Sequence, residues 1–166
     1  MMPSDFCLQF LRVFEQFRPE RYRDAIGKWT IGYGHAITQS DNLPDVITVE
    51  HAEALLRVDA GRALDLVLRQ TAGISLLPRE HEALASLVYN IGPKALDDTD
   101  STLMRHLRSG DRRNAALEFR RWHYAGGKPL GGLLRRRIAE ELWFLGGHPR
   151  SVIDIAAEGW DSLVGA

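Results

Sequence analysis

Residues 14–35 read FEQFRPERYRDAIGKWTIGYGH, a stretch in which a helical pattern gives way to a strand pattern. Pro19 disfavours helical geometry at the residue before it, so the helix that leads into this stretch is expected to end near Phe17. Beyond the proline, residues 21–24 and 29–33 have the composition of two short strands separated by a glycine-containing turn. The stretch therefore predicts a β-hairpin that directly follows a helix.

The helix before the hairpin is predicted from an N-cap and an apolar stripe. Ser4 is a favourable N-cap residue, and phenylalanines recur behind it at helical spacing up to Phe14. A helix over residues 4–17 places Glu15 in its last turn, close to the negative end of the helix dipole.

The second predicted strand has one apolar face and one small or polar face. Trp29 and Ile31 are expected on the apolar face and Thr30 on the other, because successive strand residues point to opposite sides. With a third strand expected near Val46, the hairpin would form a small β-lobe over about residues 18–50.

After the β-lobe the patterns are those of helices. Thr48 is expected to cap a long helix to about Arg69, and Pro78 begins a strongly apolar segment suited to the centre of a helical lobe. Residues 126–132, GGKPLGG, are predicted to form a loop. Further helices are expected over residues 101–108, 111–122, 133–145 and 152–163.

The fold class predicted from these elements is α+β, and mainly α. A single domain over residues 1–166 is expected, with the β-lobe at about 18–50. The helical lobe is expected at about 70–166 together with helix 4–17, and the long helix joins the two lobes. A cleft between two lobes is a common place for a ligand to bind.

Composition limits the classes of protein to which the chain can belong. It has 166 residues, a net charge of −1 and a single cysteine, Cys7, which excludes an intrachain disulfide. It has no apolar run of about 20 residues and no signal-peptide pattern. Residues 101–137 hold ten basic and two acidic residues, a net charge of +8, so a polyanion such as nucleic acid or the bacterial wall is expected as a partner.

Two carboxyl groups in the opening stretch suit the hydrolysis of a glycosidic bond, which needs a protonated acid and an ionised partner carboxylate. Glu15 lies at a helix end beside apolar residues, which favour a neutral acid, whereas Asp24 lies in a polar turn. Thr30, on the adjacent strand, is placed to hold a water against Asp24. Taken singly, the two carboxyl residues also fit an ordinary surface glutamate and a turn aspartate.

The spacing of Glu15, Asp24 and Thr30 closely resembles the catalytic signature of phage-type lysozymes, glycoside hydrolase family 24. Blocks across most of the chain resemble the same family in the same order. They are Ala83–Leu84, Tyr89–Gly92, Ser101–Leu103, Arg121–Trp122 and Gly132–Arg137 with Glu140. The resemblance implies a lysozyme-like, two-lobed fold with the active cleft between the lobes.

The resemblance also implies a reaction and the residues that carry it. The reaction is hydrolysis, with inversion, of the β-1,4 bond between N-acetylmuramic acid and N-acetylglucosamine. Glu15 is implied as the acid, Asp24 as the residue that activates water, and Thr30 as its assistant. The two carboxyls are then expected roughly 6.5–9.5 Å apart. Tyr89 and Thr102 are implied to contact the glycan.

His35 and Arg136 complete the set of candidate binding residues. For His35, a structural ion pair or hydrogen bond within the β-lobe is preferred to a catalytic role. Arg135–Arg137 open a helix, where cations are unfavourable, so one of them is expected to have a specific partner and to hold Glu15 across the cleft. No metal and no cofactor is expected, because the histidines and the cysteine lack metal-ligand spacing.

The leading functional hypothesis is a soluble, monomeric endolysin that acts on peptidoglycan glycan strands. It is expected to stay in the host cytoplasm until a holin releases it, and then to act on the wall from the periplasm, without nucleic-acid binding or stable membrane insertion. A virion-associated or secreted antibacterial lysozyme has the same chemistry. A lytic transglycosylase needs the acid but no base, and an Arg-rich nucleic-acid-binding module explains only the basic segment.

Overall fold

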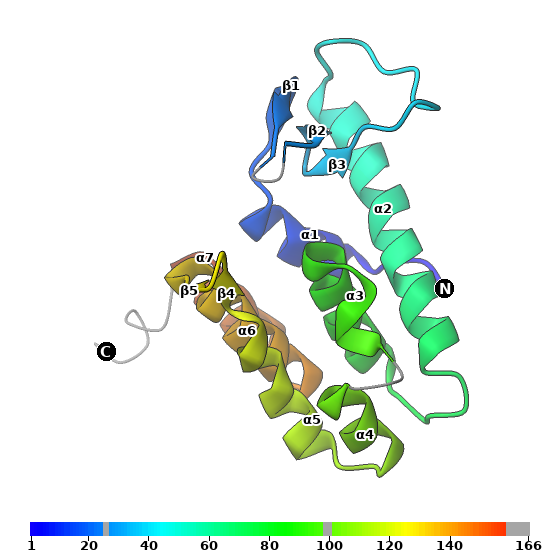
Figure 1. Cartoon of the computed structure of the whole chain (residues 1–166), viewed down its shortest axis with the longest axis vertical. Coiled ribbons are helices and arrows are strands. Elements are labelled where there is room, and N and C mark those ends of the chain that lie inside the picture. Colours follow the sequence, from blue (N-terminus) through cyan, green and yellow to red (C-terminus); the bar gives the residue numbers. More distant parts are fainter. Residues whose placement is uncertain (25–26, 98–100, 159–166) are drawn as a thin grey trace.

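Helix α2 (Val49–Gln70) runs between a small β-lobe and a larger helical lobe (Figure 1). The computed structural model describes residues 1–24, 27–97 and 101–158. The β-lobe contains β1 (Arg18–Arg23), β2 (Trp29–Gly32) and β3 (His35–Ala36). The other elements are α1 (Asp5–Phe14), α3 (Pro78–Ile91), η1 (Pro93–Leu96), α4 (Thr102–Arg108), α5 (Arg112–Glu118), η2 (Phe119–Trp122), β4 (Tyr124–Ala125), β5 (Lys128–Pro129), α6 (Gly131–Phe144) and α7 (Pro149–Glu158). The predicted fold class, α+β and mainly α, is confirmed. Among the described helices, none is long and apolar enough to cross a membrane.

Helix α1 begins where the sequence predicts and ends earlier than predicted. Ser4 caps it by accepting a hydrogen bond from a first-turn amide, and the Ser4 hydroxyl donates to Glu82 of α3 at 2.8 Å. The last helical residue is Phe14 rather than Phe17, because Glu15 already adopts an extended conformation with φ −96° and ψ 96°. Glu15 is therefore the C-cap residue and does not lie within the last turn.

The three strands of the β-lobe form one antiparallel sheet in the order β1–β2–β3. The third strand is at His35–Ala36 and not near Val46, which makes only an isolated bridge to Glu20. The reason is Gly34, whose φ of +85° lets the chain reverse at once, so that β3 pairs directly with β2. The expected position of the third strand was wrong.

The expected apolar face of β2 is only partly present. Ile31 is fully buried and packs with Ile47 and Ala52 in a small core. Trp29, by contrast, is 46% exposed. It lies outside this core, and its ring is covered instead by Arg23, its partner on β1, whose Cζ lies 4.1 Å from the ring centroid.

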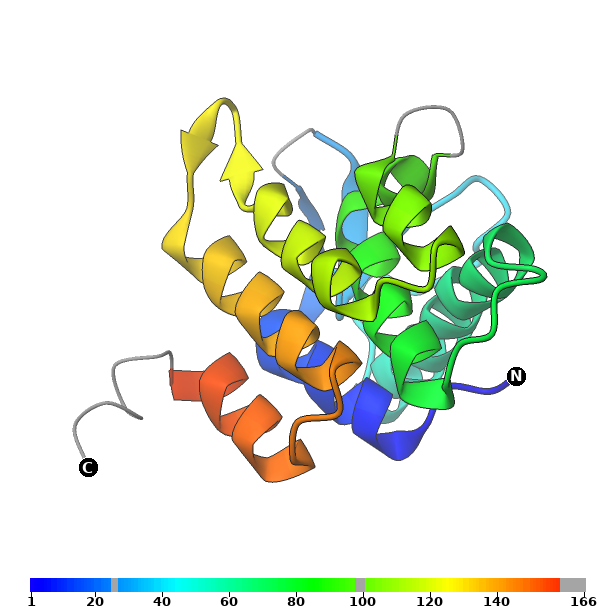
Figure 2. The same ribbon diagram turned by 90° about the horizontal axis from the view of Figure 1, so that it is seen from below.

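Helix α3 is the central helix of the helical lobe, as predicted. It packs against α2 and α6, and its Leu84 and Leu87 side chains are fully buried. Figure 2 shows α4 beside α5, and α6 beside α7. Phe10 of α1 contacts Trp143 of α6, with 5.0 Å between the ring centroids. Helix α1 therefore belongs to the helical lobe, although it precedes the β-lobe in the sequence.

Residues 126–132 are not a continuous loop. Strands β4 and β5 pair in a second, two-stranded sheet, and α6 already begins at Gly131 rather than at residue 133. Gly126 and Gly127 have φ values of +58° and +75°, as the turn of a two-residue hairpin requires. The glycine pair was therefore a hairpin signal that the loop interpretation missed.

Two other helices differ in their bounds. The helix expected over residues 111–122 is α5 followed by the 3-10 turn η2. The last helix begins at Pro149, three residues before its expected start. Its expected continuation from residue 159 to 163 lies outside the described residues.

His35 connects the β-lobe to α2. Its ring is buried, with Nδ1 2.7 Å from Asp59 Oδ2 and Nε2 3.5 Å from Asp41 Oδ2. Arg62 holds the other oxygen of Asp59 at 3.0 Å. The hydrogen bond to Asp59 raises the pKa of His35 above its ordinary value, although burial opposes this effect, and the Asp41 charge adds to it. The geometry is that of a structural ion pair and not of a side chain open to a substrate.

The His35–Asp59 pair is expected to make stability depend on pH. Because the pKa of His35 is higher in the folded chain than in the unfolded chain, its contribution is complete below about pH 6.5 and is lost as the pH rises through the folded-state value. In chemical denaturation, the loss should be on the order of 1–3 kcal/mol. Asp59→Asn should remove this pH dependence, and Asp65→Asn, on the exposed side of the same helix, should keep it. An equal pH profile in wild type and Asp59→Asn would contradict the assignment.

Candidate active site

Glu15 lies at the junction of the helical lobe and the β-lobe, directly after α1. Its side chain is 20% exposed, and its Oε1 accepts a hydrogen bond from Arg136 Nη1 at 2.6 Å. Its Oε2 faces the chain of the β-lobe, where a Cβ added to Gly34 would lie 3.4 Å away. Arg136 thus holds one carboxyl oxygen of Glu15, and the other oxygen faces Gly34 of the opposite lobe.

Arg136 reaches Glu15 from the first turns of α6 and is itself 2% exposed. Its Nε donates to Glu140 Oε1 at 3.1 Å, and its guanidinium also lies 3.4 Å from the Ser86 carbonyl oxygen of α3. Burial alone would lower the pKa of Arg136, but the Glu140 and Glu15 carboxylates outweigh it and raise that pKa. The sequence predicted that one of three consecutive arginines holds Glu15, and the structure identifies it as Arg136.

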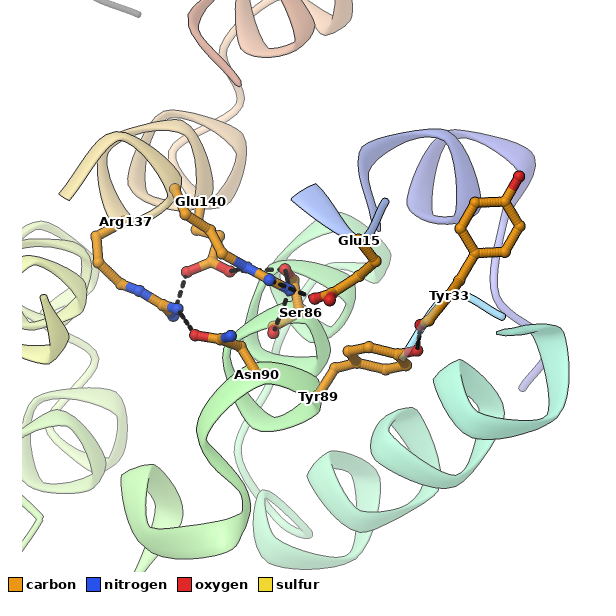
Figure 3. Close-up of polar contacts among 8 residues, drawn as sticks. Glu15, Tyr33, Ser86, Tyr89, Asn90, Arg137 and Glu140 are labelled. Atoms are coloured by element: carbon orange, nitrogen blue, oxygen red, sulfur yellow. Dashed lines mark hydrogen bonds and ion pairs between the residues drawn. The ribbon is translucent and has the colours of Figure 1, made fainter. Parts of the chain in front are cut away.

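Glu140 is the centre of the buried polar cluster behind the site (Figure 3). It is fully buried and receives hydrogen bonds from both Arg136 and Arg137, the latter at 2.7 Å. The Ser86 hydroxyl donates to Glu140 Oε1 at 2.6 Å, and Arg137 also donates to the Asn90 side chain. Buried charges are tolerated when they are paired and hydrogen-bonded, and each charge here has such partners.

Several cations of the basic segment that suggested a polyanionic partner are paired with carboxylates within the fold. Arg120 pairs with Glu141 at 2.5 Å, Arg121 with Glu118 at 3.0 Å, and Arg112 with Glu80 at 3.5 Å, in addition to the arginines bound to Glu140. Most of these carboxylates come from α3 and α6. Part of the net charge of residues 101–137 is therefore compensated by internal ion pairs, so this charge does not by itself indicate a nucleic-acid surface.

Asp24 and Thr30 lie at the same end of the β1–β2 hairpin. Asp24 Oδ1 accepts a hydrogen bond from the Lys28 amide at 2.8 Å, which is the turn chemistry that the sequence left open for this residue. Thr30 is buried, and its hydroxyl donates to the Lys28 carbonyl oxygen at 3.1 Å. Both oxygens keep lone pairs that can accept a hydrogen bond from a further ligand.

Tyr22 is within range of the charges of both candidate carboxyls. It is the strand partner of Thr30 on β1. Burial raises the pKa of its phenol, Arg18 lowers it, and the negative charges of Glu15 and Asp24 both raise it further. The charges of the helix-end carboxyl and of the hairpin carboxyl therefore both act on this phenol. The separation expected between the two carboxyls stays a prediction.

Tyr89 spans the two lobes. Its hydroxyl, at the end of α3, donates to the Tyr33 carbonyl oxygen at 2.7 Å (Figure 3). Burial first, and then the charge of Glu15, raise the pKa of Tyr89 above its ordinary range. The hydroxyl therefore stays neutral and serves to fasten α3 to the β-lobe beside Glu15, which is the packing role that the sequence left open against sugar contact.

Thr102 is not next to Glu15. It lines a separate cavity of about 490 Å³ on the helical lobe, together with Lys94, Arg121 and Trp122. Its hydroxyl accepts a hydrogen bond from Arg105 at 3.0 Å. Of the predicted site residues, the structure thus brings Glu15, Tyr89 and Arg136 together. Asp24 and Thr30 lie on the hairpin, Thr102 lines its own cavity, and His35 pairs with Asp59. Within the described residues, no group of three or more His, Cys, Asp or Glu side chains is placed to hold a metal ion.

The sequence did not predict a role in the site for Ser86, Asn90 or Glu140. Two signals were available. Ser86 interrupts the apolar face of α3, and Glu140 follows Arg136 by four positions, the spacing at which side chains on a helix meet. What the sequence does not show is that α3 and α6 pack against each other, which brings these three residues to the same place.

Glu140→Gln is expected to destabilise the fold strongly. The substitution leaves Arg136 and Arg137 buried without the carboxylate between them, and breaking a buried pair in this way costs about 3–5 kcal/mol. Chemical denaturation measures the loss, and Glu158→Gln, at an exposed position of α7, is the matched control that should change stability by less than about 0.5 kcal/mol. Similar stabilities for the two variants would show that the cluster does not hold the fold.

Comparisons with known proteins identify relatives of this chain. A family model described as phage lysozyme matches residues 12–140. The endolysin of Acyrthosiphon pisum secondary endosymbiont phage 1 is 41% identical over 145 residues, which cover 85% of this chain and 96% of that relative. The chain spans 56% and 58% of the length of two Bacillus phage endolysins that it also matches.

Solved structures give the same result for the fold. The endolysin from Escherichia coli O157:H7 phage FAHEc1 is similar with a TM-score of 0.74 and 30% identity, over 88% of this chain and 94% of that one. A mutant of P22 lysozyme is similar with a TM-score of 0.72 and 30% identity, over 88% of this chain and 99% of the other. The two-lobed fold is therefore lysozyme-like, and the chain belongs to the phage lysozyme family of glycoside hydrolases.

Proposed function

We propose that this lysozyme acts as an endolysin that hydrolyses the β-1,4 bond between N-acetylmuramic acid and N-acetylglucosamine in peptidoglycan, with Glu15 as general acid. The observation that carries the proposal is the asymmetric setting of the Glu15 carboxyl. Arg136 fixes Oε1 at 2.6 Å, while Oε2 faces Gly34 and the space between the lobes. An acid that is oriented on one side and free on the other is suited to protonate a leaving oxygen.

Arg136 has two parts in the proposed reaction. It restricts the rotation of the Glu15 carboxyl, so that the proton-bearing oxygen keeps its direction. Once the proton has moved to the glycosidic oxygen, the same guanidinium stabilises the carboxylate that is left. Because Glu140 and Ser86 hold Arg136 from behind, this cation is already in place before the substrate arrives.

Asp24 is proposed as the base that activates the attacking water, and Thr30 as the residue that positions this water. Their location on the hairpin of the β-lobe supports a position across from Glu15, on the other side of a bound sugar. Inverting enzymes need such an arrangement, with a gap of roughly 6.5–9.5 Å between the carboxyls for the water. We propose inversion of the anomeric configuration for this reason, and no covalent sugar–enzyme intermediate.

Further parts of the proposal concern binding and location. The Thr102 cavity, with the Trp122 ring and polar side chains around it, has the composition of a site for a sugar or for a peptide attached to it. Tyr89 is proposed to border the sugar nearest Glu15. The chain is proposed to act as a monomer on the cell wall, and to reach the wall from the host cytoplasm after a holin has opened the inner membrane.

Glu15→Gln and Asp24→Asn test the catalytic assignment. Each variant keeps the size of the side chain and removes its ability to exchange a proton. The rate of turbidity loss of outer-membrane-stripped cells should fall at least about 100-fold for Glu15→Gln, the usual scale for loss of a general acid, and strongly for Asp24→Asn. Glu158→Gln should clear the suspension at the wild-type rate. Full clearing by Glu15→Gln would refute its role as the acid.

The stereochemistry of the product tests the mechanism separately. If water attacks from the Asp24 side while Glu15 protonates the leaving oxygen, the new reducing end should first appear as the α-anomer. Proton NMR of the products within the first turnovers, before mutarotation, measures this ratio. A first-formed β-anomer would indicate retention, and 1,6-anhydro-muramic ends would show that the reaction is a transglycosylation.

A further inference from the structure

A cavity of about 400 Å³ lies beside Glu15, between the end of α1 and the start of α6. Val13 and Phe14 form an apolar part of its wall. Its charged lining groups are Glu15, Arg135 and Arg136. Arg136 is already bound to Glu15 and Glu140, so Arg135 is the charge in this cavity that the cluster behind the site does not use.

Arg135 differs from its two neighbours in lacking a carboxylate partner among the described residues. Its Nε is buried and has no hydrogen-bond acceptor within the described part of the chain. Its Cζ lies 6.0 Å from the centroid of the Phe14 ring, a contact at the outer limit for an attraction between a cation and an aromatic face. A buried N–H group without an acceptor is unfavourable. This group of Arg135 is therefore available to a ligand that binds in the cavity.

The first turn of α6 adds donors to the same cavity. Over the described residues, no side chain is hydrogen-bonded to the start of α6, whose N-cap residue is Leu130. A Cβ added to Gly131 or Gly132 would meet nothing within 4 Å, so the space in front of the first turn is open. The amides of a first helical turn and the positive end of the helix dipole both favour an anion.

We propose that this cavity binds a carboxylate of the peptidoglycan substrate, with Arg135 as its ion-pair partner and the first-turn amides of α6 as further donors. The inference rests on the proposed function, because it places the muropeptide beside Glu15. Peptidoglycan presents carboxylates on its stem peptides, and on the lactyl group of muramic acid where a peptide is absent. Both have the same charge and shape, which suit the fork of a guanidinium. Arg135 is therefore a specificity-determining residue, which acts in binding and not in proton transfer.

The test compares substrates that differ only in this charge. The first is native peptidoglycan. The second is the same material with its carboxyls converted to amides by carbodiimide and ammonium, and the third is glycan from which an amidase has removed the stem peptides, leaving lactyl carboxylates. The variants are Arg135→Gln, Arg135→Lys and, as a matched charge control, Arg113→Gln on exposed α5. Thermal unfolding of each variant monitors the fold.

For wild type, the substrate concentration at half-maximal rate should be roughly three- to tenfold lower on native than on amidated peptidoglycan, the scale of one partly exposed charged hydrogen bond. Arg135→Gln should remove this difference with little change in maximal rate, Arg135→Lys should keep part of it, and Arg113→Gln should keep all of it. If stripped glycan behaves like native material, the cavity accepts the lactyl carboxylate as well as a carboxylate of the stem peptide. If it behaves like amidated material, the ligand is the carboxylate of the stem peptide.

Three results would overturn the proposal. They are a wild type that does not distinguish native from amidated wall, an Arg135→Gln variant that still does, and an Arg113→Gln variant that loses the distinction equally. The last would assign the effect to the overall charge of the lobe. None of these results touches the lysozyme activity itself, whose failure would appear as no cleavage of any of the three substrates by wild type.

Discussion

The Arg136–Glu15 ion pair requires the surrounding structure to supply further partners for a buried guanidinium. A guanidinium that is 2% exposed is stable only where carboxylates and carbonyls surround it, because burial without partners would cost far more than the fold can supply. Glu140 of α6 and Ser86 of α3 supply these partners by accepting hydrogen bonds from Arg136. The end of α1, the middle of α3 and the start of α6 must therefore meet at one place. The carboxyl proposed to donate the catalytic proton lies at that place.

The β-lobe is joined to this centre by few contacts, each with a defined partner. Tyr89 holds the Tyr33 carbonyl oxygen from the end of α3, and His35 binds Asp59 on α2. Gly34, between Tyr33 and His35, leaves room for the Glu15 carboxyl. The hairpin that carries Asp24 and Thr30 belongs to the lobe that these contacts hold, and this hairpin is proposed to supply the groups that activate water.

Several charged side chains of the helical lobe pair with one another inside the fold. Arginines of α5, η2 and α6 bind glutamates of α3 and α6, so the basic and acidic parts of the sequence compensate each other in space. Arg135 departs from this pattern beside the proposed catalytic acid. An arginine without a carboxylate partner, in a cavity next to Glu15, favours recognition of a particular anionic group at this place.

The sequence by itself determined the local elements and the residues worth testing. Ser4 and Thr48 cap helices where predicted, because an N-cap depends only on the residues of one turn. The hairpin after Pro19 and the candidates Glu15, Asp24 and Thr30 also followed from a short stretch. Three local predictions were wrong: the position of the third strand, the loop at Gly126–Gly127 and the buried face of Trp29. In each case a glycine turn or the edge of a small core outweighed the pattern of neighbouring residues.

Only the tertiary structure decided which residues surround Glu15. That Arg136 and not its neighbours reaches the carboxyl depends on the rotation of α6 about its own axis, and adjacent helical residues point about 100° apart. Ser86, Asn90 and Glu140 gain their roles because α3 and α6 pack together, and Thr102 lies in another cavity although it comes from a family block. Contacts between residues 50 to 121 positions apart are set by the packing of whole helices, which no short segment of the sequence specifies.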